Sequence, residues 1–209
     1  MKKALIFDLD NTIYPVSSIG PYLFTDLFQL LDQHPEILNE ATLNAAKDEL
    51  QRRHYHLVAD KYNFGAELTE AGLKLLKNLE YQQPMQPFDA YHQLKGIPLK
   101  KFLVTTGFSK LQWSKVKQLG IENDFDEIHI VDPDLSARTK KDVFAGLLLK
   151  YGYQPEDVLV IGDDPESEIK AATELGIDTF LFDPGGRHAE ALVSYRSKDL
   201  NDVVKFLKL

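Results

Sequence analysis

Two pairs of acidic residues follow apolar runs in this chain, and carboxylates in such positions can do chemistry. Asp8 and Asp10 come directly after the first run. Asp163 and Asp164 follow a later run, with Glu168 close behind. Alternate side chains of an extended segment project to the same side, so Asp8 and Asp10 repel each other unless a cation such as Mg²⁺ lies beside them. A solvated acidic turn has the same composition, and Asp164 also suits a helix start, so both readings remain open.

Another apolar run ends in Thr105, Thr106 and Gly107. Hydroxyl groups at the end of a strand can donate hydrogen bonds to a phosphate oxygen, together with nearby main-chain N–H groups. Threonine is also an ordinary strand residue, so this segment is a weak signal by itself.

A basic segment begins a later predicted helix. Cations there oppose the helix dipole, so either a buried anion or a solvated surface must explain them. The segment contains three candidates: Arg138, Lys140 and Lys141.

The elements that position these residues alternate between strand and helix. Continuous apolar runs predict buried parallel strands at Ala4–Phe7, Phe102–Val104, Ile128–Val131, Val158–Ile161 and Thr179–Phe182. Helical periodicity and capping signals predict helices at Ser109–Leu119, with Ser109 as the N-cap, and at Thr139–Tyr151, Pro165–Leu175 and Asp199–Leu207. This alternation predicts an α/β fold with a Rossmann-like, doubly wound parallel sheet.

One long stretch interrupts the alternation. Residues 16–88 contain no convincing strand, and a helix is predicted from Pro35 to about Tyr62, followed by a second with a leucine stripe. The prolines at 84 and 87 predict a linker. We therefore expect an α/β core from residues 1–15 and 89–209, and a helical domain from residues 16–88. Within that domain, residues 52–56 form a polar and aromatic cluster that is either a substrate contact or a solvated face with Tyr55 in the core.

Composition excludes several classes of function. The chain has 209 residues, with 24 basic and 32 acidic side chains and a formal net charge of −8. This acid excess argues against nucleic acid or an anionic membrane as a partner, because both need a basic face. The absence of cysteine excludes disulfides, thiolate zinc sites and cysteine nucleophiles. No apolar run approaches the roughly 18 residues of a membrane span, and none has the length of a signal peptide, so we expect a cytoplasmic protein.

The order of these motifs resembles that of the haloacid dehalogenase superfamily of hydrolases. The resemblance covers nearly the whole chain and is most specific at Phe7–Thr12 and at Val160–Glu168. It implies a helical cap domain inserted after the first strand of the α/β core. It also implies that Asp8 is a nucleophile that becomes an aspartyl phosphate, and that Asp10 is the acid/base that protonates the leaving oxygen and then activates water.

The resemblance assigns roles to the remaining candidates. Thr105 is implied to bind the transferring phosphoryl group and Lys140 to steady its charge. Mg²⁺ is implied to be bound by the Asp8 carboxylate, the main-chain carbonyl of Asp10 and Asp163. The supporting acids are implied to be Asp164 and Glu168.

Two positions depart from the family pattern. Thr106 stands where many relatives have asparagine, and with Gly107 it is expected to bind substrate at the mouth of the site. No proline follows the lysine, so Lys141 and Arg138 stay open as alternatives to Lys140, which we favour.

The reaction expected from this resemblance is Mg²⁺-dependent hydrolysis of a small phosphomonoester. The second acid, Asp10, favours phosphoryl transfer over dehalogenation, because only the former has a leaving oxygen to protonate. A sugar-phosphate mutase shares all four motifs, and a non-catalytic phospho-ligand-binding domain is the alternative of another class. Residues 10–15 also resemble pyrimidine 5′-nucleotidase-like members, which suggests a nucleoside monophosphate as a substrate. The chain is expected to act as a monomer or homodimer.

Overall fold

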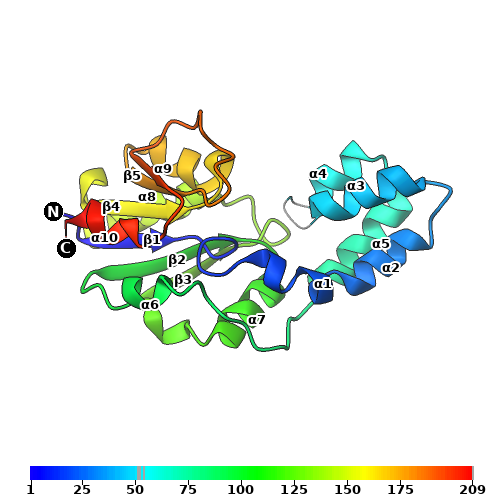
Figure 1. The fold of residues 1–209 in the computed structure, drawn as a ribbon, viewed down its shortest axis with the longest axis horizontal. Coiled ribbons are helices and arrows are strands. Elements are labelled where there is room, and N and C mark those ends of the chain that lie inside the picture. Colours follow the sequence, from blue (N-terminus) through cyan, green and yellow to red (C-terminus); the bar gives the residue numbers. More distant parts are fainter. Residues whose placement is uncertain (51–52, 54, 209) are drawn as a thin grey trace.

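A computed structural model describes residues 1–50, 53 and 55–208, and shows a parallel β-sheet with helices on both faces beside a separate group of helices (Figure 1). In the described residues, the sheet has six parallel strands in the order β3-β2-β1-β4-β5-β6. The strands are β1 (Ala4–Phe7), β2 (Lys100–Thr106), β3 (Glu127–Val131), β4 (Val158–Gly162), β5 (Asp178–Phe182) and β6 (Tyr195–Ser197). The predicted α/β fold is confirmed.

The helices fall into two sets. Those between β1 and β2 are η1 (Val16–Ser18), α1 (Gly20–Leu23), α2 (Thr25–Asp32), α3 (Glu40–Leu50), α4 (Tyr55–Lys61), α5 (Gly65–Asn78) and α6 (Tyr91–Leu94). Those after β2 are α7 (Ser109–Leu119), η2 (Glu122–Asp124), α8 (Lys140–Tyr151), η3 (Pro155–Asp157), the π-helical turn η4 (Pro165–Ile169), α9 (Lys170–Thr173) and α10 (Asp202–Leu207). In the described part of the chain, no helix is long and apolar enough to cross a membrane.

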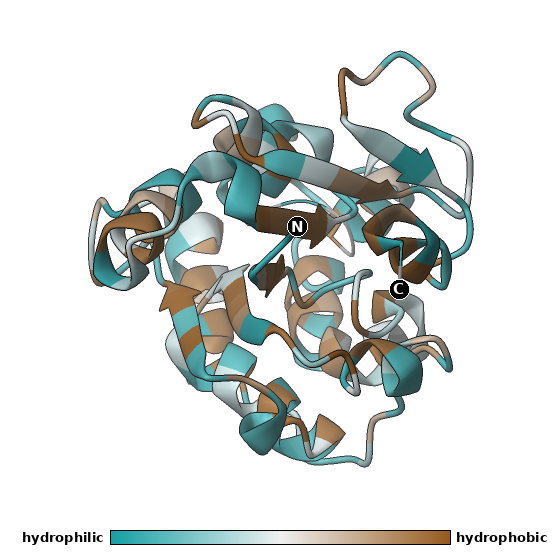
Figure 2. Ribbon diagram, turned by 90° about the vertical axis from the view of Figure 1, so that its left-hand side faces the viewer, coloured by the Kyte–Doolittle hydropathy of each residue, from teal (hydrophilic) through white to brown (hydrophobic). Residues whose placement is uncertain are grey.

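The sheet is buried on both faces, as its continuous apolar strands predict. Leu5 and Phe7 of β1 pack on the side of α6, α7 and α10, whereas Ala4 and Ile6 pack on the side of α8 and α9. Figure 2 shows these strands as a hydrophobic centre between amphipathic helices. All five predicted strands are present. β6 was not predicted, because this short, half-buried edge strand has no apolar run.

Particular residues fix where helices α7 and α8 begin and end. Gly120 and Gly152 end α7 and α8 with left-handed φ of 67° and 66°. This confirms the predicted helix ends at Leu119 and Tyr151. Thr139 caps α8 in a capping box with Asp142, so the helix begins at Lys140. The prediction that Ser109 is the N-cap of α7 is wrong. Its N–H and hydroxyl instead donate to the carboxylate of Asp132, at 2.7 Å each.

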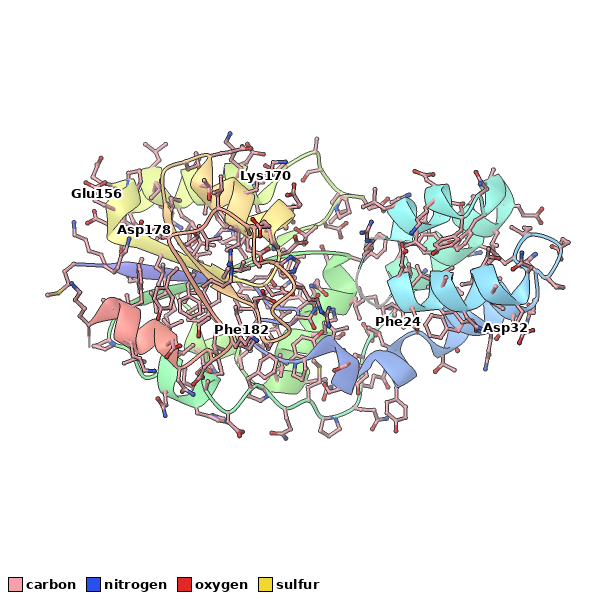
Figure 3. The ribbon with its side chains drawn as sticks, turned by 45° about the horizontal axis from the view of Figure 1, so that its top comes forward. Phe24, Asp32, Glu156, Lys170, Asp178 and Phe182 are labelled. Atoms are coloured by element: carbon pink, nitrogen blue, oxygen red, sulfur yellow. The ribbon has the colours of Figure 1, made fainter. Side chains whose placement is uncertain are left out.

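Helices α2 to α5 have an apolar cluster of their own, separate from those of the sheet. The single helix predicted from Pro35 to Tyr62 is wrong, since α3 begins only after Asn39, whose side chain accepts the N–H of Thr42 at 3.0 Å. Figure 3 places Phe24 and Asp32 on this helical group, and Asp178 and Phe182 on the sheet.

The chain enters and leaves the helical group at one point. The N–H of Phe88 donates to the carbonyl of Ile13 at 2.8 Å, so the segment before η1 lies against the segment after the linker. The linker is non-helical, as its prolines predict, and the N–H of Tyr81 donates to Ser114 on α7 at 2.9 Å. These contacts fix the helical group beside the carboxyl edge of the sheet.

Candidate active site

The candidate residues gather at the carboxyl ends of β1, β2 and β4, the edge at which open α/β sheets bind ligands. Asp8 follows β1 directly, and its N–H donates to the carbonyl of Ile161 at 3.0 Å. This bond continues the β1–β4 pairing by one residue and holds Asp8 rigidly at the strand end. Asn11 then turns the chain with a φ of 57°, a left-handed value that asparagine tolerates better than most residues.

Lys140 lies between two buried carboxylates. Its Nζ is 2.6 Å from Oδ1 of Asp8 and 2.7 Å from Oε2 of Glu168. All three side chains are buried. Burial alone would lower the pKa of Lys140, but the negative charges of Asp8 and Glu168 outweigh it and raise that pKa. The lysine is therefore a permanent cation beside Asp8.

Glu168 is held on both of its oxygens. Oε1 accepts the N–H of Asp164 at 2.8 Å, while Oε2 accepts from Lys140. Gly162 makes this position possible, because a Cβ there would lie 2.2 Å from Oε1 of Glu168. Asp164 turns outward and accepts the N–H of Glu166 at 2.8 Å, the capping role that its position before the helix allows.

Asp8, Asp163 and Glu168 form a compact acidic group. Each offers one carboxylate oxygen, and these oxygens all lie within 4.8 Å of one another. Burial, with the neighbouring negative charges, raises the pKa of Asp163 to about 9. Burial raises the pKa of Asp8 to about 7, despite the charge of Lys140. One ammonium thus faces three carboxylates, and a hard divalent cation with oxygen ligands fits this donor set. Both oxygens of Glu168 already accept hydrogen bonds, so Asp8 and Asp163 would hold the ion. The hydroxyl of Thr12 lies 3.5 Å from Oδ1 of Asp163.

The carboxylate of Asp10 has a different environment, on the side of α7. Lys115 Nζ lies 2.8 Å from its Oδ1 and 3.0 Å from its Oδ2. Gln112 donates to Oδ2 at 3.1 Å, and the hydroxyl of Tyr14 donates to Oδ1. Burial would raise the pKa of Asp10, but the charge and hydrogen bond of Lys115, with the bonds from Tyr14 and Gln112, hold it below its usual range.

The segment expected to bind phosphate lies at the end of β2. Thr105 is buried, and its hydroxyl accepts from Gln112 Nε2 at 2.7 Å. Thr106 is half-buried at the strand end, and Gly107 follows with a φ of 151°, a value favoured by glycine. The N–H of Gly107 donates to the carbonyl of Val131 at 3.0 Å, which ties this turn to β3.

The three candidate cations separate clearly in space. Only Lys140 is buried against Asp8, whereas Lys141 pairs with Glu174 at the surface, 2.8 Å apart. Arg138 is exposed and lines a cavity of about 530 Å³ that also reaches Thr106 and Lys140.

Sequence reasoning missed the partners of Asp10. The pattern of Ser109–Leu119 predicts only a helix and assigns no role to Gln112 or Lys115. They could have been noticed as polar residues that interrupt an apolar face made by Leu111 and Val116. In the helical group, Arg52 and His54 lie outside the described residues. Tyr55 is buried there and donates to the carbonyl of Leu68 at 3.0 Å.

The helical group contacts the loop after β3 beside the site. Lys77 of α5 forms an ion pair of 2.6 Å with Asp134 of that loop. On the neighbouring side, Lys110 of α7 donates to the carbonyl of Asn78 at 3.2 Å. The helical group is therefore held against the loop after β3 and against α7 by polar contacts of α5 and of the residue that follows it in the chain.

Comparison with known proteins finds haloacid dehalogenase-like hydrolases and phosphatases. A family model described as haloacid dehalogenase-like hydrolase matches residues 2–176. The glyceraldehyde 3-phosphate phosphatase of Methanopyrus kandleri is 25% identical over 200 residues, covering 86% of this chain and 83% of that protein. The phosphoserine phosphatase of Thermus thermophilus is 26% identical over 139 residues, covering 66% and 55%. The magnesium-bound putative HAD-hydrolase YfnB of Bacillus subtilis has the same fold, with a TM-score of 0.71, 19% identity, and coverage of 100% and 99%.

Proposed function

Since the chain belongs to the haloacid dehalogenase-like hydrolases, we propose that it is a Mg²⁺-dependent phosphatase that hydrolyses a small phosphomonoester through an aspartyl phosphate. The observation that carries this proposal is the position of Lys140 between Asp8 and Glu168, with Asp163 beside them. A buried carboxylate with a permanent cation and a cation-binding group at its side is equipped to attack an anionic phosphorus centre.

In the first step, Oδ of Asp8 attacks phosphorus and the bond from phosphorus to the leaving oxygen breaks. Asp10 is ionised in the substrate-free site, where Lys115 keeps its pKa low, so it must take up a proton as substrate binds. It then gives this proton to the leaving oxygen, so the product leaves as an alcohol. Lys140 stays beside Asp8 and offsets part of the negative charge on the transferring group. Thr105 lies at the end of the neighbouring strand, where its hydroxyl can bond a phosphoryl oxygen.

In the second step, water attacks the phosphorus of the aspartyl phosphate. The Asp10 carboxylate takes a proton from that water, the bond from phosphorus to Asp8 breaks, and inorganic phosphate leaves. Asp8 is thereby restored as a carboxylate and Asp10 as a carboxylic acid, so atoms and protons balance over the cycle. Bound Mg²⁺, held by Asp8, Asp163 and the main-chain carbonyl of Asp10, would reduce repulsion between the anionic nucleophile and the anionic substrate.

The substrate is proposed to be a small soluble metabolite. Residues 16–88 are proposed to act as a cap that covers the site and excludes water. The curated relatives named above act, by their names, on glyceraldehyde 3-phosphate and phosphoserine. Together with a nucleoside monophosphate, these are the compounds to test first.

A phosphate-release assay tests the proposal. Purified protein with Mg²⁺ is given p-nitrophenyl phosphate and a panel of triose phosphates, phosphoserine, sugar phosphates and nucleotides. Release of phosphate that stops with a chelator and with Asp8→Asn supports the proposal. A matched variant, Glu174→Gln, removes an acid at the surface and should keep full activity. Activity that survives in Asp8→Asn, or isomerisation of a sugar phosphate without phosphate release, would show that the proposal is wrong.

A further inference from the structure

Helix α7 carries two buried polar side chains that the proposed mechanism does not use. Gln112 is 1% exposed and Lys115 is 4% exposed. They lie three residues apart and so share one face of the helix, next to Leu111 and Val116, which pack in the core. Lysine is rarely buried without a partner, because removing its charge from water is costly. Its partner here is Asp10, the proposed acid/base.

Asp10 is held on both carboxylate oxygens. Lys115 contacts both oxygens, at 2.8 and 3.0 Å, Gln112 donates to Oδ2 at 3.1 Å, and Tyr14 donates to Oδ1. These donors come from two different elements, α7 and the turn after β1. The carboxylate therefore cannot turn away from this position without losing several hydrogen bonds at once.

Gln112 also connects Asp10 to the segment expected to bind phosphate. The same Nε2 that donates to Asp10 lies 2.7 Å from the hydroxyl oxygen of Thr105. The main chain at Gly107 passes close to this side chain, since a Cβ there would lie 3.1 Å from Cδ of Gln112. One side chain of α7 thus sets the spacing between the end of β2 and the segment after β1.

We propose that Lys115 and Gln112 are positioning residues, which fix the Asp10 carboxylate in the orientation for proton exchange with the leaving oxygen and with water. This inference rests on the phosphatase function proposed above. It adds no reactant, because the proton still moves between Asp10, the leaving alcohol and water. A purely structural ion pair would instead affect every substrate and every background equally.

The first test compares two leaving groups. Lys115→Met keeps most of the apolar side chain and removes its charged end. The value of kcat/KM is then measured with glycerol 2-phosphate and with p-nitrophenyl phosphate. Nitrophenolate leaves without a proton, so kcat/KM for p-nitrophenyl phosphate should change less than about twofold. The leaving oxygen of glycerol needs a proton. Because positioned acids contribute about 10²–10⁴-fold, kcat/KM for glycerol 2-phosphate should fall at least ~10-fold. Equal losses for both substrates would overturn the inference.

The second test asks whether Lys115 acts through Asp10. In a double-mutant cycle on glycerol 2-phosphate, Lys115→Met should change kcat/KM less than about twofold once Asp10→Asn is present. The same loss in both backgrounds would overturn the inference, because Lys115 would then act independently.

Two controls keep these tests decisive. Lys101→Met removes another buried lysine, which donates to the carbonyl of Ile97 at 2.5 Å near the start of β2, and should leave the ratio between substrates unchanged. If Lys115→Met does not fold, as judged by circular dichroism, Lys115→Gln, which removes the charge but keeps a polar group against Asp10, takes its place in both tests. Loss of phosphate release in the wild type itself would reject the proposed function. An active wild type with equal losses in the variant would reject only the positioning role.

Discussion

The ammonium nitrogen of Lys140 lies 2.6 Å from Oδ1 of Asp8, although the two residues are 132 positions apart in the sequence. The pair forms because β1 and β4 are neighbours in the sheet and α8 begins at Lys140, directly above the strand ends. Its neighbour Lys141 points to the surface. Adjacent lysines in one helical turn thus have very different environments, and this difference can be measured.

Lys140→Met should destroy activity and destabilise the protein. Asp8 and Glu168 would remain buried without their cation, which costs about 3–5 kcal/mol for a broken buried ion pair. Loss of this charge beside the phosphoryl group should lower kcat at least ~100-fold. Urea unfolding and phosphate release measure the two effects. Lys141→Met is the matched control, and its activity should stay within about twofold of the wild type. Comparable losses in both variants would contradict the assignment of Lys140.

Without metal, Asp163→Asn should be more stable than the wild type, and the difference in the free energy of unfolding should grow as the pH rises. The pKa of Asp163 is about 9 in the fold, against 3.8 for an ordinary aspartate, so the folded state binds more protons between these values. The wild type should therefore lose stability as the pH rises through this window, by at most about 1.4 kcal/mol per pH unit from this residue. The asparagine variant should not show this contribution.

Urea unfolding at several pH values, with a chelator present, measures this difference between the two proteins. Asp26→Asn, at an exposed acid of α2, is the control. Added Mg²⁺ should stabilise the wild type, by about 2.7 kcal/mol at a hundred times the dissociation constant, and should stabilise Asp163→Asn much less. A Mg²⁺ effect of equal size in both proteins would remove Asp163 from the metal site.

Asp10→Asn should accumulate the phosphorylated enzyme. With p-nitrophenyl phosphate the leaving group needs no proton, so Asp8 can still be phosphorylated, but no carboxylate remains to activate water. Rapid mixing should show a burst of nitrophenol close to one equivalent, followed by slow turnover. Acid-quenched protein should carry a phosphate that hydroxylamine removes. Asp8→Asn should show neither burst nor label, and a label retained in that variant would place the intermediate elsewhere.

Gly162→Ala should reduce both activity and stability. The added Cβ would lie 2.2 Å from Oε1 of Glu168 and force that side chain away from Lys140. Overpacking of this kind costs about 1–3 kcal/mol. Gly146→Ala, at an exposed position inside α8, should instead stabilise the protein by about 0.5–1 kcal/mol, because glycine is unfavourable in a helix. Thermal unfolding of both variants tests the contrast, which a destabilised Gly146→Ala variant would contradict.

The five strands β1 to β5 were predictable because each contains a continuous apolar run. Runs such as Val158–Ile161 are apolar throughout and can only be buried on both faces. The start of α3 was not predictable, because Pro35 resembles a helix start, whereas Asn39 caps the helix that actually forms. The edge strand β6 was missed because pairing with β5, rather than burial, makes it a strand.

The candidate site was predictable where motifs follow strands and not where helices reach in. Asp8 and Asp163 stand next to strand ends, so the parallel sheet alone brings them together. Lys115 reaches Asp10 only because α7 packs on the sheet with one particular face inward. That rotation depends on the whole apolar contact between helix and sheet, which no short motif records.

The hydrogen bond from Phe88 to Ile13 has a consequence for the history and engineering of this protein. Because the main chain departs and returns at a single place, helices α2 to α5 are joined to the sheet as a unit with its own apolar interior. The flanking residues Val16, Ile19, Leu23, Tyr81 and Met85 pack in the core of the sheet instead. A different insertion could be grafted between the same two segments without altering the pairing of β1 with β2 and β4. If residues 16–88 select the substrate, as proposed, the chemistry at Asp8 and the choice of substrate would depend on two separately packed parts of the chain.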